Sequence, residues 1–391
     1  MLRVWRRPVV LVLALAALIR VSPEPVAPAY AQARDHAVVV GDVTTVERIG
    51  APALTYQSGR DLAARFIDMA GGVMGSKAVR IVAADPGGDS AAAVRAVEEL
   101  KEQGVTLFMG GMVADVTLAA ARAAAPTPFL AIDARLPAAV VRDVPNLFQI
   151  GPSAEALGRV LAAEAARSPA IRWGVVAQDD YFGRALAHAF WNELRAARPE
   201  VELAMESYVP TLSGEVGPAL DTLAGAAPDG LLLGLRDGDL VAFVQGARGG
   251  LLDGTAVMVP QVGTPDMLRA LGTDLPDGWV TTGYPCCETG GQPHRAFAEA
   301  YRTADPNGAT PTLTALYGYA AMITVGTVLD SAWSEKPDAL TKELAGLTLS
   351  TPVGEMRFDP GTRQSSLPVW IGRTLGGQFV EARRVDPSAR R

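Results

Sequence analysis

The chain has 391 residues, enough for two or three domains of ordinary size. Hydrophobic residues make up 49% of the sequence and charged residues 20%, which is the usual mixture of a globular protein. The formal net charge is −7 at pH 7, so the sequence does not carry the basic footprint of a nucleic-acid-binding protein. We therefore expect no nucleic-acid partner.

The N-terminus has the pattern of a secretory signal peptide. Basic residues precede an apolar run over 8–19, and Ala29-Tyr30-Ala31 forms a small-x-small cleavage site. We predict a signal peptide over 1–31 and a mature protein that is soluble outside the cytoplasm. The Arg6-Arg7 pair leaves the export route open between the Sec and twin-arginine pathways. We expect no later apolar stretch long enough to cross a bilayer.

Only two cysteines occur, Cys286 and Cys287, and they are neighbours in the sequence. Adjacent cysteines fit ordinary disulfide geometry only with strain. In an oxidising compartment the sequence is compatible with a vicinal disulfide and also with two free thiols. Both alternatives stay open at this point.

Strand and helix patterns alternate along the chain. The first apolar runs that indicate strands are found at 36–43, 78–85, 105–111 and 127–134. Segments with helical spacing of apolar residues separate these runs, and the same alternation starts again near residue 146. This βαβ rhythm predicts an α/β fold with two doubly wound parallel-sheet lobes. Strand ends that face each other across a cleft are a favoured ligand site.

The last part of the chain has a different pattern. A long helix is predicted over 312–333, and 354–374 has the pattern of a hairpin. The turn of this hairpin is expected at Asp359-Pro360-Gly361.

The motifs of common enzymes are missing from the sequence. It contains no G-x-S-x-G, H-E-x-x-H or C-x-x-C motif, and its histidines have no metal-ligand spacing. The segment GGVMGSK at 71–77 is not a phosphate-binding loop, because no Ser or Thr follows its lysine. We therefore predict a protein that is not an enzyme and that holds no metal or cofactor.

Two strand-to-helix junctions carry features of a binding site. Gly110-Gly111 ends the strand at 105–111, where a bare backbone either packs tightly or approaches a ligand. The segment QDDYFGRAL at 178–186 places Tyr181 or Phe182 at the carboxyl end of another strand. An aromatic ring there either stacks on a ligand or packs beneath the loop.

Nearly the whole mature chain resembles the Leu/Ile/Val-type periplasmic solute-binding proteins of ABC importers. The resemblance rests on the order and spacing of the segments DMAGGVMGSKAVRIVAAD, FMGGMVADVTLAAA, NLFQIGPS, QDDYFGRALAHAF, PDGLLLGLRDGDLVAFVQGARGGL, TALYGYAAM and GEMRFDP. It implies a type I periplasmic-binding fold with hinge crossovers near Gly151, Thr282 and Thr351. Lobe 1 would then span 34–150 plus 283–350, and lobe 2 would span 151–282 plus 351–391.

The resemblance also implies a function and a location. The protein would close around a small-molecule ligand in the periplasm and deliver it to the permease of an ABC importer, and we expect it to act as a monomer. An alternative role on the same scaffold is a periplasmic sensor or accessory protein, associated with a receptor or a periplasmic enzyme system.

The ligand site of the family maps onto both lobes and the hinge. Met112 to Asp115 replace a hydroxyl-rich stretch that usually holds an α-carboxylate, and Asp133-Ala134-Arg135 replace a second carboxylate-binding stretch. The ligand-binding residues implied by the resemblance are Gly111, Met112, Asp115, Ala134, Arg135, Tyr181, Phe182, Arg236, Gln261 and Tyr284.

Several of these positions depart from the family's amino-acid chemistry. Asp115 would repel a carboxylate, and we expect it instead to cap the helix that follows. Gln261 replaces the acidic residue that often meets a ligand ammonium group. Arg135 and Arg236 can bind a carboxylate bidentately, or they can form salt bridges with Asp115, Asp133 or Asp237. We predict a ligand that is not a standard α-amino acid but a carboxylate with an apolar or aromatic body.

Overall fold

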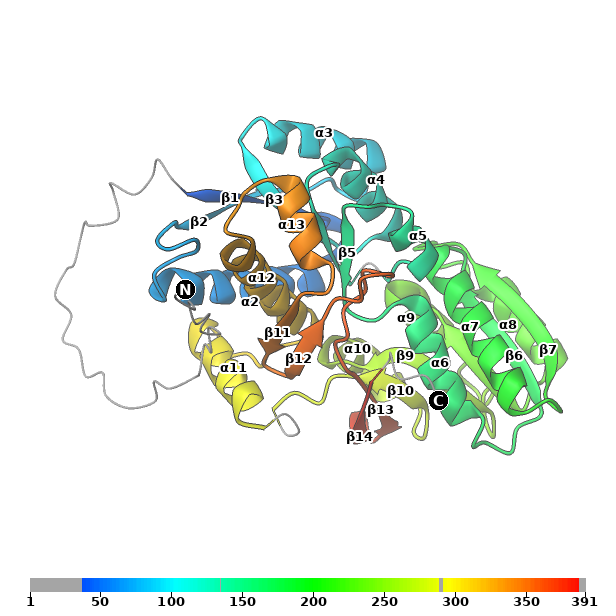
Figure 1. The fold of residues 1–391 in the computed structure, drawn as a ribbon. Helices are drawn as coiled ribbons and strands as arrows, with labels where there is room; N and C mark the ends of the chain where they lie inside the picture. Colours follow the sequence, from blue (N-terminus) through cyan, green and yellow to red (C-terminus); the bar gives the residue numbers. More distant parts are fainter. Residues whose placement is uncertain (1–36, 134, 288–290, 387–391) are drawn as a thin grey trace, which may run out of the picture.

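The computed structural model describes residues 37–133, 135–287 and 291–386. The predicted signal peptide and the expected site residue Ala134 lie outside these ranges. The first lobe contains a parallel sheet with the strand order β2-β1-β3-β4-β5. Of these strands, β1, β2, β3 and β5 are labelled in Figure 1. Its strands are β1 (Val38–Thr44), β2 (Val79–Ala84), β3 (Val105–Gly111), β4 (Phe129–Ile132) and β5 (Leu147–Ile150).

Helices cover both faces of this first sheet. On one face lie α2 (Ala51–Met69), α11 (Gly291–Ala304), α12 (Leu313–Ala332) and α13 (Pro337–Leu344). On the other face lie α3 (Ser90–Lys101), α4 (Ala114–Ala124) and α5 (Ala138–Arg142). The short helix α1 (Val46–Ile49) follows β1. The C-terminal segments α11 to α13 therefore complete the core of the N-terminal lobe.

The second lobe is built in the same way, with the strand order β14-β13-β10-β9-β8-β6-β7. Its parallel strands are β6 (Arg172–Gln178), β7 (Glu202–Val209), β8 (Gly230–Gly234), β9 (Ala256–Gly263) and β10 (Val280–Gly283). The antiparallel strands β13 (Val369–Leu375) and β14 (Gln378–Val385) extend one edge. Helices α6 (Ala154–Ala165) and α7 (Tyr181–Ala197) pack on one face. Helices α8 (Gly217–Ala226), α9 (Asp237–Gly246) and α10 (Pro265–Leu271) pack on the other. The predicted α/β fold with two parallel-sheet lobes is confirmed.

The chain passes between the lobes at the ends of three strands. It leaves the first sheet after β5 and the second sheet after β10. The small sheet of β11 (Thr348–Thr351) and β12 (Gly354–Arg357) precedes the last passage. A crossover was expected near Thr351, but Val353, Met356 and Phe358 pack in the core of the first lobe. The chain joins the second sheet only at β13, so we propose a third crossover at about residues 359–368.

Helix α12 corrects one expectation from the sequence. This helix has 20 residues and contains an 18-residue window with a mean hydropathy of 1.3, so by length and composition alone it could cross a membrane. The expectation that no later stretch is long enough was therefore wrong. However, 78% of the apolar window is buried within the protein. Gly318 lies so close to α2 that an added Cβ would come within 2.2 Å of the Tyr56 carbonyl oxygen. This burial is typical of a core helix.

Cys286 and Cys287 form a vicinal disulfide in the segment between β10 and α11. Cys286 also packs against the core of the first lobe. Of the two alternatives left open by the sequence, the structure has the disulfide, and it lies in the passage between the lobes.

Candidate ligand site between the lobes

In the first lobe, the segments that follow β1, β3 and β4 meet at one edge of the sheet. The parallel register pairs Thr44 with Gly111, and Gly111 with Ile132. The Met112 N–H donates a hydrogen bond to the Ile132 carbonyl at 3.0 Å, which continues the pairing beyond β3. Residues 112, 133 and 135 are thereby brought to the same edge, as Brändén's rule for ligand sites requires.

The two glycines at the end of β3 are explained by packing. Gly110 and Gly111 have φ angles of 127° and 125°, which side chains disfavour. A Cβ on Gly110 would lie 2.3 Å from the Val43 carbonyl oxygen, and one on Gly111 would lie 2.7 Å from Thr117 Oγ1. Of the two alternatives weighed for this junction, tight packing accounts for both residues. The role of Gly111 in ligand binding stays a prediction.

Asp115 does not cap helix α4. The helix begins at Ala114, its N-cap is Val113, and no side chain caps it. Asp115 is therefore already inside the first turn, and its side chain is exposed. Its carboxylate can still interact favourably with the helix dipole, but the expected N-cap was wrong.

In the second lobe, the start of α7 turns Phe182 inward and Tyr181 outward. Asp180 is the N-cap of this helix, and its carboxylate accepts a hydrogen bond from the Gly183 N–H at 2.8 Å. Phe182 is fully buried, whereas Tyr181 is 47% exposed. Of the two aromatic residues expected at this strand end, Phe182 is the one beside the arginines.

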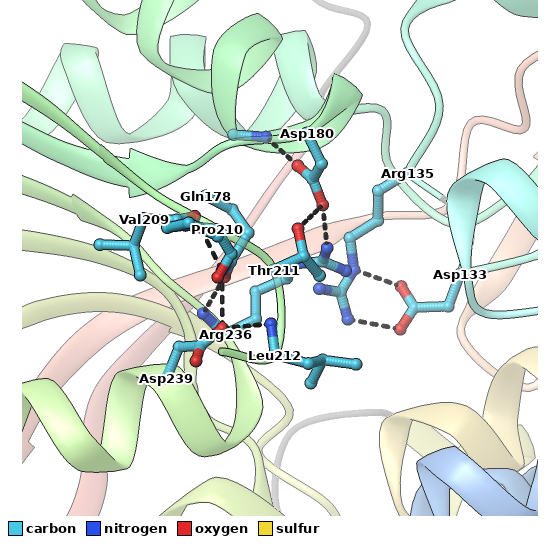
Figure 2. Close-up of polar contacts among 11 residues, drawn as sticks. Asp133, Arg135, Gln178, Asp180, Val209, Pro210, Thr211, Leu212, Arg236 and Asp239 are labelled. Carbon is cyan, nitrogen blue, oxygen red and sulfur yellow. Dashed lines mark hydrogen bonds and ion pairs between the residues drawn. The ribbon is translucent and has the colours of Figure 1, made fainter. Parts of the chain in front are cut away.

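Arg236 lies on the Phe182 ring. It follows β8 as the N-cap of α9, and its guanidinium carbon is 4.8 Å from the ring centroid. Its Nη2 pairs with Asp180 Oδ2 at 2.5 Å (Figure 2). Among the described residues, the buried Nε of Arg236 has no hydrogen-bond partner. Because an unpaired buried donor is costly, this N–H is a point where a ligand acceptor would be favoured.

Arg135 reaches the same ring from the first lobe. Its guanidinium carbon is 5.4 Å from the Phe182 centroid. Its Nε and Nη2 donate to the two carboxylate oxygens of Asp133 at 3.0 and 2.7 Å, a bidentate pair (Figure 2). Burial lowers the pKa of Arg135, but the carboxylates of Asp133 and Asp237 outweigh it and raise the pKa, so the guanidinium stays charged.

Three residues near the arginines have positive φ angles, which are uncommon for residues other than glycine. Asp133 and Arg135 have φ angles of 46° and 52°, and Asp237 in the second lobe has a φ of 49°. Non-glycine residues in this left-handed region cost about 1–3 kcal/mol each and gather at functional sites.

Gln261 and Tyr284 lie at strand ends near the hinge. The Gln261 N–H donates to Thr282 Oγ1 at 2.8 Å. The Tyr284 hydroxyl is hydrogen-bonded to His294 Nε2 at 2.5 Å, and its ring packs edge-on against Trp370. Burial raises the pKa of Tyr284. The hydroxyl of Tyr284 is thus already engaged within the hinge, and contact of either residue with a ligand stays a prediction.

Sequence reasoning missed the polar residues that hold Arg236. Asp180 lies in the segment 178–186 but was not expected to bind an arginine, and its side chain is only 13% exposed. Its position directly before the helix was a usable signal, because Asp is among the residues preferred at the N-cap. Gln178 and Asp239, both 1% exposed, were not singled out at all.

Comparison with known proteins identifies the family of this fold. The family model described as periplasmic binding protein matches residues 41–378. The chain belongs to this family. The resemblance to Leu/Ile/Val-type solute-binding proteins and the type I fold are thereby confirmed. The comparison with curated proteins gave no match.

Solved structures share the fold at low sequence identity. A solute-binding protein from Rhodopseudomonas palustris BisB5 in complex with 3,4-dihydroxybenzoic acid superposes with a TM-score of 0.78 and 20% identity, over 90% of this chain and 98% of that one. Another R. palustris protein, in complex with 4-hydroxybenzoate, has a TM-score of 0.77 and 16% sequence identity. The match covers 90% of this chain and 96% of that protein. LivJ from Streptococcus pneumoniae, in complex with isoleucine, has a TM-score of 0.78 and 16% sequence identity. The match covers 90% of this chain and 100% of LivJ.

Proposed function

We propose that this periplasmic binding protein captures a small carboxylate with a flat apolar body between its lobes and delivers it to an ABC importer. The observation that carries the proposal is the contact of Phe182 with two guanidinium groups, one from each lobe. A ligand that touches this cluster touches both lobes, so its binding energy favours the closed state over the open one.

The chemistry of the cluster suits a carboxylate. Asp133 and Asp180 balance the charges of Arg135 and Arg236, but each guanidinium has five N–H donors and the aspartates use only some of them. The buried Nε of Arg236 is the donor that lacks a partner among the described residues. A carboxylate oxygen would satisfy it, and the Phe182 ring offers a planar apolar surface nearby.

The names of similar proteins support this ligand class. Solved relatives include proteins in complex with benzoate, 4-hydroxybenzoate and 3,4-dihydroxybenzoic acid. They also include amino-acid complexes. However, the resemblance to the family implies that Gln261 replaces the acidic residue that would meet an ammonium group. We therefore favour an aromatic acid over an amino acid, and we propose a monomer that binds its ligand without chemical conversion.

A thermal-shift screen tests the ligand class. The panel is benzoate, 4-hydroxybenzoate, 3,4-dihydroxybenzoate, leucine and isoleucine. A ligand at 100 times its dissociation constant adds about 2.7 kcal/mol of stability, which such a screen detects. We expect at least one aromatic acid to raise the melting temperature more than either amino acid does. Leucine or isoleucine as the best ligand would contradict the proposal.

Uptake of the radiolabelled best ligand by cells that lack this gene tests the transport role. We expect uptake to fall and to return when the gene is restored. Normal uptake without the gene, together with tight binding by the purified protein, would instead support a sensor or accessory role.

A further inference from the structure

We propose that Asp239 and Gln178 are positioning residues that fix Arg236 at the ligand site. This inference rests on the proposed function only in naming Arg236 as a ligand-binding residue. Neither residue is exposed by more than 1%, so each would act through its neighbours. The pair connects the start of α9, the end of β6 and the loop after β7.

Asp239 is the centre of the arrangement. It lies in the first turn of α9, and its Oδ1 accepts a hydrogen bond from the Gly214 N–H at 2.7 Å. Its Oδ2 accepts from the Leu212 N–H at 2.6 Å and from Gln178 Nε2 at 2.7 Å (Figure 2). A buried carboxylate is tolerated only with such partners, and these three donors supply them.

Gln178 connects Asp239 to the backbone of Arg236. It is the last residue of β6, and its Oε1 accepts the Arg236 N–H at 3.2 Å. Its Nε2 also lies within 3.4 Å of the carbonyl oxygens of Val209 and Pro210. The backbone of Arg236 is thereby tied to the ends of two neighbouring strands.

The side chain of Arg236 is held by the other branch of the same network. Asp180 pairs with the Arg236 guanidinium, and the Thr211 hydroxyl lies 3.5 Å from the same carboxylate oxygen (Figure 2). Thr211 belongs to the loop whose next residue, Leu212, is bound by Asp239. Loss of the Asp239 carboxylate would loosen both the backbone of Arg236 and the loop beside its partner Asp180.

The test compares Asp239→Asn with a matched control, Asp229→Asn. Asp229 lies in the same lobe and also accepts backbone hydrogen bonds, from the N–H groups of Ile171 and Arg172 at 3.3 and 3.0 Å. These contacts lie at the opposite edge of the sheet, before β6 and β8. Asp229 is exposed whereas Asp239 is buried, so Asp229→Asn controls for loss of a backbone-bound carboxylate in this lobe, and denaturation of both variants measures their difference in stability.

The first readout needs no ligand. It is the NMR signal of the Arg236 Nε–H, assigned through its loss in Arg236→Lys. We expect Asp239→Asn to shift and broaden this signal, and Asp229→Asn to leave it unchanged. An unchanged signal in Asp239→Asn would overturn the proposal. If Asp239→Asn does not fold, Gln178→Met removes the link to Arg236 at nearly constant shape, and the same outcomes apply.

The second readout is calorimetric titration with 4-hydroxybenzoate. We expect Asp239→Asn to bind about tenfold more weakly, equal to about 1.4 kcal/mol, and Asp229→Asn to bind as the unmodified protein does. Adding Asp239→Asn to Arg236→Met should cost nothing further, because both changes act through one side chain. Equal losses in the two Asn variants would overturn the proposal. If the unmodified protein binds no member of the panel, the proposed function fails, while the NMR signal still decides the positioning role.

Discussion

The guanidinium of Arg135 lies 5.4 Å from the ring centroid of Phe182, although the two residues belong to different lobes. Arg135 follows β4 of the first sheet, and Phe182 begins α7 after β6 of the second. Arg236 contacts the same ring at 4.8 Å. The buried ring of Phe182 thus contacts two guanidinium groups, those of Arg135 and Arg236, which are 101 positions apart in the sequence. This cluster is the basis of the binding role proposed above.

Replacing Arg236 by Met should weaken binding of 4-hydroxybenzoate. A hydrogen bond to a charged group is worth about 1.5–3 kcal/mol, so we expect a loss of roughly 10- to 150-fold in affinity, measured by calorimetric titration. Arg184→Met is the matched control, because Arg184 also pairs with an aspartate and lies 4.2 Å from the Tyr208 ring centroid on the surface. Equal affinity losses in both variants would argue against a role for Arg236.

Phe182→Leu should lower ligand affinity beyond its effect on stability. The substitution keeps an apolar side chain but leaves a small cavity, so it should cost about 1–3 kcal/mol of stability. Phe190→Leu is the control, since Phe190 is also fully buried in α7 but packs on Trp173. Chemical denaturation should give similar stabilities for Phe182→Leu and Phe190→Leu. Titration with 4-hydroxybenzoate should show weaker binding only in Phe182→Leu. Unchanged affinity in Phe182→Leu would show that the ring is merely core.

The alternation of strands and helices could be predicted from the sequence because each element has its own local pattern. The strand predicted over 105–111 coincides with β3, and the helix predicted over 312–333 closely matches α12. The hairpin expected over 354–374 was only partly correct. Its turn at Asp359 forms, but β12 pairs with β11 and β13 pairs with β14. Strand partners depend on distant segments, which a local pattern does not contain.

Gly110→Ala should destabilise the first lobe strongly. The new Cβ would meet the Val43 carbonyl oxygen and would occupy a φ of 127°. Strain and overpacking each cost about 1–3 kcal/mol, so we expect a loss of at least about 2 kcal/mol in the free energy of unfolding. Gly217→Ala, at the start of α8 with open space around it, should be neutral or stabilising by up to about 1 kcal/mol. Chemical denaturation of both variants checks this, and equal stabilities would contradict the packing argument.

His294 should make stability depend on pH. Burial lowers the pKa of His294 in the folded protein below its ordinary value of about 6.5. As the pH falls from about 6.5 towards the folded pKa, the unfolded chain therefore binds a proton that the folded protein does not, and the free energy of unfolding decreases. His294→Gln should reduce this decrease, as measured by denaturation at several pH values. The control is His188→Gln, because His188 is exposed. An equal pH dependence of stability in His294→Gln and the unmodified protein would show that His294 does not cause it.

The contents of the site were harder to predict than its location. Brändén's rule indicated the strand ends, and Arg135, Phe182 and Arg236 are indeed brought together there. Asp133 was one of three aspartates named from the sequence as possible partners of the arginines, whereas Asp180, the partner of Arg236, was not among them. The choice between Tyr181 and Phe182 depends on the cap made by Asp180, which fixes the phase of α7. Gln178 and Asp239 act through buried contacts between separate loops, which leave no local pattern in the sequence.

The most direct test of the binding role is a crystal structure of the protein with 4-hydroxybenzoate. We expect a carboxylate oxygen of the ligand at about 3 Å from Arg236 Nε, with the ligand ring against Phe182 and between the lobes. A ligand bound outside the cleft, or a carboxylate held without either Arg135 or Arg236, would contradict the account.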